Sequence, residues 1–145
     1  MGRFTMCAAV RFSPWFGFEV SSLSKEELTF LEVELFMQVY KALREYFYQM
    51  NKPYLLLLKF DKQEEEAMIE NNFWKYIIND ILRSEEYSIT GIAFYTETSE
   101  EVICDLITGV NTRPSFPLTK KVIDLHRTVR PMLYNEMVKR IIAQY

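Results

Sequence analysis

The sequence lacks most of the motifs that mark enzymes and membrane proteins. Its 145 residues include only four glycines, five prolines, two cysteines and one histidine. Glycine-rich phosphate loops, dinucleotide-binding fingerprints and nucleophile elbows require glycines at fixed spacings, and none of these patterns occurs. No apolar run approaches the roughly 20 residues that a membrane-spanning helix needs. These absences argue against a nucleotide-dependent enzyme and against a membrane-spanning chain.

The few cysteines and the single histidine leave little material for a disulfide or a metal site. Cys7 and Cys104 are far apart in the sequence and have no neighbouring cluster of metal ligands, so we expect two reduced thiols. His126 has no second histidine to join it in a metal site. The N-terminus lacks the apolar core and cleavage site of a signal peptide. We therefore predict a cytoplasmic protein that holds no cofactor and no metal.

Apolar residues, by contrast, are abundant. They make up 49% of the chain, and aromatic residues alone make up 15%. A chain of this length and composition predicts one globular domain that covers residues 1–145. The aromatic content exceeds what a core of this size needs. It therefore points to apolar surface that a partner or a second copy of the chain would cover.

Four stretches have the pattern of β-strands. Residues 4–12 alternate between two faces, and residues 16–20 could return beside them as a hairpin. Residues 54–60 form an unbroken apolar run after Pro53, which is typical of a central strand covered on both faces. Residues 87–96 are rich in β-branched and aromatic side chains. We expect these stretches to form one small mixed sheet.

Helical periodicity accounts for most of the remaining chain. Ser24 and Glu27 form a capping-box pattern at the start of the first helix. Thr98 and Glu101 form a second such pattern ahead of residues 99–108, for which we expect a helix and keep a strand as the alternative. The expected helices cover residues 24–50, 63–83, 99–108, 118–129 and 131–144, with a loop at 111–117. The sequence therefore predicts an α/β (α+β mixed) fold, a small mixed β-sheet of about four strands packed with helices and followed by a helical C-terminus.

The charges are distributed unevenly, although the net charge is only −3. Residues 61–105 carry twelve Asp and Glu against three Lys and Arg, whereas residues 106–145 carry seven Lys and Arg against two Asp and Glu. A dense acidic segment is usually a solvated face, and the sharper interpretation is a surface that docks a basic protein. Exposed aromatic side chains would act as anchors on such a surface. The candidate binding residues are Glu64, Glu65, Glu66, Glu70, Trp74, Glu85, Glu86, Glu100 and Glu101.

The leading functional hypothesis is a small non-enzymatic domain that neutralises or regulates a basic protein partner through this acidic surface. Immunity proteins, antitoxins and other inhibitors share the profile of one compact acidic domain without cofactor motifs or disulfides. The main alternative is a nucleic-acid-binding protein that uses the basic C-terminal helices. Its candidate contacts are Lys120, Lys121, Arg127 and Arg130, which could instead pair with the acidic segment.

A cofactor-free hydrolase or nuclease is the third hypothesis. His126 could act as a general base, but Asp124 stands two residues away and cannot face it on a helix. We therefore expect an ordinary surface or half-buried helical histidine. Asp61, Glu19 and Asp80 could form a carboxylate cluster like that of RNase H-like nucleases, yet the first strand lacks the acidic residue that such a site needs. The plainer expectation is that Asp61 caps the segment that follows it.

Overall fold

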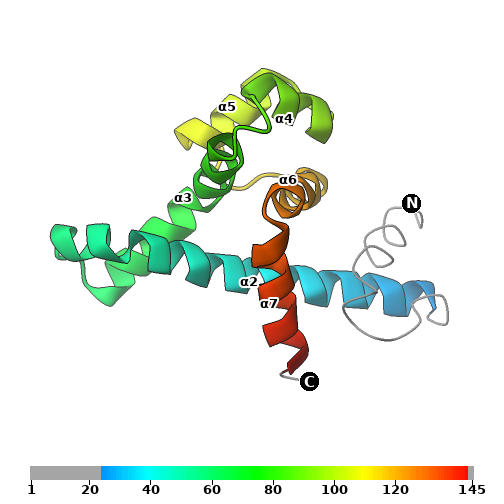
Figure 1. Ribbon diagram of the computed structural model, residues 1–145, viewed down its shortest axis with the longest axis horizontal. Coiled ribbons are helices and arrows are strands. Elements are labelled where there is room, and N and C mark those ends of the chain that lie inside the picture. The colour runs from blue at the N-terminus through cyan, green and yellow to red at the C-terminus, as the bar shows by residue number, and fades with distance from the viewer. Residues whose placement is uncertain (1–23, 144–145) are drawn as a thin grey trace. The chain divides into compact units, whose positions relative to one another are not determined.

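The computed structural model describes residues 24–143 and shows an all-helical fold. Helices account for 83% of these residues, and no β-strand occurs among them. The expected α/β fold with a small mixed sheet is therefore wrong. The strands predicted at 4–12 and 16–20 lie outside the described residues. The helices (Figure 1) are α2 (Lys25–Leu58), α3 (Lys62–Arg83), α4 (Ile89–Thr96), α5 (Glu100–Thr108), α6 (Phe116–Val129) and α7 (Pro131–Ala143).

The described residues fall into two compact units. The first contains residues 24–43 and 134–143, where α2 and α7 each bury an apolar stripe. The second contains residues 44–133, in which α3 and α4 each pack against both α5 and α6. All the candidate residues for binding a protein partner or nucleic acid lie in the second unit. The single domain predicted for residues 1–145 stays a prediction.

Helix α2 runs through the stretch that the sequence pattern assigns to a central strand. It continues past Pro53 into the leucine run, and Lys59 then adopts a left-handed conformation with φ of 56°. Leu55 is 1% exposed, but Leu56 and Leu57 are 64% and 79% exposed, so the run is not covered on two faces. Leucine has high helix propensity and no β-branch, and consecutive leucines therefore extend a helix readily.

Helix α4 replaces the strand predicted for residues 87–96. Ser88 caps its first turn by accepting a hydrogen bond from the backbone N–H of Gly91 at 3.1 Å. The buried residues of α4 follow helical rather than alternating spacing: Ile92, Ala93 and Thr96. The serine cap and the helical spacing together outweigh the strand propensity of the β-branched side chains.

Helices α2 and α3 begin within one residue of the predicted positions. The capping box is confirmed, because Glu27 N donates to Ser24 Oγ at 3.1 Å and Ser24 N donates to Glu27 Oε1 at 3.4 Å. Asp61 caps α3 in the same way: its Oδ1 accepts from Glu64 N at 2.8 Å, and its N–H donates to Glu64 Oε1 at 3.3 Å. The expectation that Asp61 caps the following segment is therefore confirmed.

Helix α5 confirms a helix rather than a strand for residues 99–108. Its cap is Ser99, whose hydroxyl accepts a backbone hydrogen bond at 3.4 Å, so the expected box of Thr98 and Glu101 is wrong. Gly109 ends the helix in the left-handed region with φ of 80°, where the lack of a Cβ removes the steric penalty.

The two C-terminal helices are separated at Pro131, as predicted. Pro131 occupies the first turn of α7, where a missing backbone N–H loses no helical hydrogen bond. Helix α6 starts earlier than predicted, and the loop expected at 111–117 is correspondingly shorter. Its cap is Ser115, whose Oγ accepts from Leu118 N at 3.3 Å, and Pro117 lies in its first turn.

Candidate functional site

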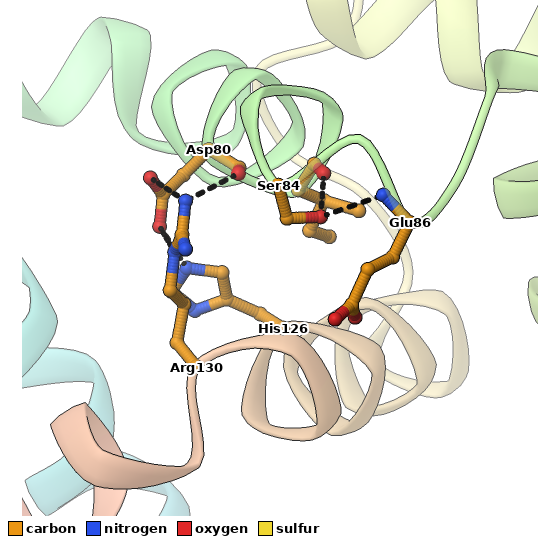
Figure 2. A network of polar contacts seen from close by, with 6 residues as sticks. Asp80, Ser84, Glu86, His126 and Arg130 are labelled. Carbon is orange, nitrogen blue, oxygen red and sulfur yellow. Dashed lines mark hydrogen bonds and ion pairs between the residues drawn. The ribbon is translucent and has the colours of Figure 1, made fainter.

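A buried polar network joins α3 to the end of α6. Asp80 is 4% exposed and His126 is fully buried, and His126 Nε2 lies 2.7 Å from Asp80 Oδ2. Arg130, which follows the last turn of α6, donates from Nε to Asp80 Oδ2 at 3.2 Å and from Nη2 to Asp80 Oδ1 at 3.3 Å. Nη2 also donates to the Asp80 backbone carbonyl at 3.3 Å. Figure 2 shows both side chains facing the Asp80 carboxylate, which uses both of its oxygens.

The electrostatics of this network favour an ionised Asp80. Burial opposes the charged form and would raise the pKa of Asp80. The hydrogen bonds from His126 and Arg130 outweigh that effect and lower the pKa from 3.8 to about 2. The hydrogen bond to Asp80 in turn raises the pKa of Arg130 above its ordinary value. The charged Asp80 carboxylate on α3 is therefore paired inside the protein with His126 on α6 and with Arg130, which follows α6.

The enzyme hypothesis gains no support from these positions. His126 is fully buried rather than on the surface or half-buried as expected, and it packs 6.3 Å from the Phe47 ring. A general base must reach the proton of a substrate, and this imidazole already contacts Asp80 inside the core. Asp61 and Asp80 stand near opposite ends of α3, about 28 Å apart along its axis. The predicted carboxylate cluster therefore does not form from these two residues, and its third member, Glu19, lies outside the described residues.

No group of three or more metal-ligating side chains lies together between residues 24 and 143. Within the same residues, no helix is long and apolar enough to cross a membrane.

The four basic residues of the nucleic-acid hypothesis all make contacts within the chain. Lys120 Nζ lies 5.2 Å from the centre of the Phe116 ring. Lys121 Nζ lies 3.0 Å from Glu97 Oε2 and 3.3 Å from the Thr96 carbonyl oxygen. Arg127 pairs with Asp124 at 3.3 Å, and Arg130 belongs to the Asp80 network. The expected pairing of basic residues with the acidic segment is thus confirmed for Lys121 and Arg130.

Three of the acidic residues along the first half of α3 have structural roles. Glu64 completes the capping box with Asp61. Glu65 accepts a hydrogen bond from Tyr48 Oη at 2.7 Å, and this bond raises the pKa of Tyr48. Glu70 pairs with Arg44 at 3.2 Å. The contacts of Glu65 and Glu70 tie α3 to α2, so these side chains have a role that does not require a partner.

Trp74 does not provide the expected aromatic anchor. It is 8% exposed, and its ring packs edge-on against Phe73 with centroids 4.9 Å apart. The expectation that Trp74 is exposed is therefore wrong, because the buried face of α3 includes this side chain. An anchor for a partner must be exposed before binding, which excludes this side chain in the observed fold.

The other candidate glutamates gather at the far end of α3. α3 has 22 residues, so about 33 Å separates its two ends and the predicted acidic surface divides in two. The second group consists of Glu85, Glu86, Glu100 and Glu101, all of them exposed. Ser84 Oγ donates to the Ile81 carbonyl at 2.6 Å and accepts from Glu86 N at 3.3 Å, which fixes the turn that leads toward α4 (Figure 2).

Phe94 is an exposed aromatic beside this second group. Its side chain is 87% exposed on α4, one turn after Thr90. Thr90 Oγ1 donates to Glu100 Oε1 at 2.5 Å, and this bond brings the first turn of α5 beside that face of α4. We call Phe94, Glu85, Glu86, Glu100 and Glu101 the α4–α5 acidic surface. The sequence pattern does not single out Phe94, because the strand predicted for residues 87–96 would place alternate side chains on opposite faces of a sheet.

The helical stripes contain a signal for the buried network as well. Asp80 follows Phe73 and Ile77 at the spacing of one helical face, and His126 follows Val122 in the same way. A carboxylate on one apolar stripe and a lone histidine on another indicate two polar groups that must satisfy each other inside a core.

Comparison of the chain with family models, with curated proteins and with solved structures finds no match.

Proposed function

We propose that this chain is a small non-enzymatic protein-binding domain that neutralises or regulates a basic protein partner, as immunity proteins, antitoxins and other inhibitors do. One observation carries the proposal. The basic side chains of α6 and its C-cap are held by internal contacts, whereas the four glutamates of the α4–α5 acidic surface form no ion pair with the described residues. The field at this surface is therefore negative and available to a positively charged partner.

Phe94 supplies the kind of anchor that such an interface requires. Binding energy in protein interfaces concentrates in a few buried side chains, and aromatic residues surrounded by polar groups are frequent among them. Phe94 is 87% exposed in the isolated chain, so a partner pocket would remove a large apolar area from water. The free thiol of Cys104 fits a reducing environment, and we propose the cytoplasm as the compartment.

Affinity capture with matched variants tests this proposal. The tagged protein is incubated with native lysate, washed at low and then at physiological salt, and the bound proteins are identified by mass spectrometry. We expect one stoichiometric basic protein that leaves as the salt concentration rises, because exposed charges are screened within about 8 Å at physiological ionic strength. The double variant Phe94→Ala/Glu101→Lys should capture about tenfold less of it.

The control is the double variant Met132→Ala/Glu136→Lys, which changes the same kinds of exposed side chain on α7. It should capture the partner as the wild type does. Equal capture by both double variants would place the interface elsewhere, and recovery of nucleic acid without a basic protein would overturn the proposed function.

A further inference from the structure

We draw no further inference here: the strongest candidate, the apolar cluster of Tyr54, Leu56, Leu57 and Leu58 that the last turns of α2 expose, carries no proposal because nothing in the structure shows what covers it.

Discussion

Asp80 stabilises the fold of the second unit only while its carboxyl group is ionised. Burial alone would raise its pKa, but the hydrogen bonds from His126 and Arg130 hold it at about 2, below its ordinary value of 3.8. For a lowered pKa, the added stability is fully present above the unfolded value and is lost as pH falls toward the folded value. The difference between the two values corresponds to about 2 kcal/mol in the free energy of unfolding.

Replacing Asp80 by Asn should therefore change both the stability and its dependence on acid. At neutral pH, Asp80→Asn should lower the free energy of unfolding by about 3 kcal/mol, because the buried His126 and the partly exposed Arg130 lose their anionic partner. Between about pH 4 and pH 2, the variant should lose about 2 kcal/mol less than the wild type. Denaturant titrations across this range measure both effects, with the exposed Glu101→Gln as control. Equal acid sensitivity in Asp80→Asn and wild type would show that the network does not hold the carboxylate ionised.

At this same scale, the sequence indicates which groups are buried but not how they pair. Asp80 and His126 both fall on apolar stripes, so their burial could be predicted from helical spacing alone. Their contact depends on how α3 and α6 are rotated against each other, which no local pattern encodes. Arg130 lies beyond the last turn of α6, and its role depends on the C-cap geometry that turns the chain there.

Some helices have clear start and stop signals in the sequence. Others have the composition of a β-strand, although they are helical in the structure. α3, α5 and α6 begin and end near capping residues or prolines, α7 begins at Pro131, and each was predicted as a helix. The end of α2 and all of α4 are short apolar stretches, for which periodicity does not separate a strand from a helix. In α4 the cap at Ser88 decides the outcome, and in α2 the helix simply continues past Pro53.

A pair of glycine substitutions tests the helical assignment of α4. Gly91 lies inside α4, and an added Cβ would meet Tyr87 Cδ1 at 3.4 Å, an ordinary contact. Gly91→Ala should therefore raise the free energy of unfolding by about 0.5–1 kcal/mol through helix propensity. Gly109 has φ of +80° with open space around it, so Gly109→Ala should lower stability by about 1 kcal/mol through backbone strain alone.

Thermal or denaturant unfolding of the two glycine variants gives the comparison directly. Opposite signs are expected from the same chemical change, because one glycine is helical and the other is left-handed. Destabilisation by Gly91→Ala as large as that by Gly109→Ala would contradict the helical environment of residue 91.

For the whole molecule, the sequence predicts the distribution of charge better than it predicts the fold class. The acidic middle and the basic end are visible in the sequence, and the structure pairs Lys121 with Glu97 and Arg130 with Asp80 across them. The α/β class was wrong because two of the four expected strands are helical, and the other two lie outside the described residues. The acidic segment divides into two separated groups because α3 is long, and the sequence predicted the length of this helix. The exposure of Phe94, by contrast, could be recognised only from the structure.

The internal pairing of the basic residues leads to a prediction about nucleic acid. Affinity for phosphates depends on cations that can release counterions, and Lys121, Arg127 and Arg130 already contact carboxylates of this chain. The full chain should therefore pass through a phosphate-rich matrix at about 50 mM salt without retention. Lys120→Glu/Lys121→Glu should elute at the same position as the wild type. If the wild type were retained and this double variant were not, the basic helices would be a phosphate-binding surface after all, and the acidic-surface proposal would lose the asymmetry on which it rests.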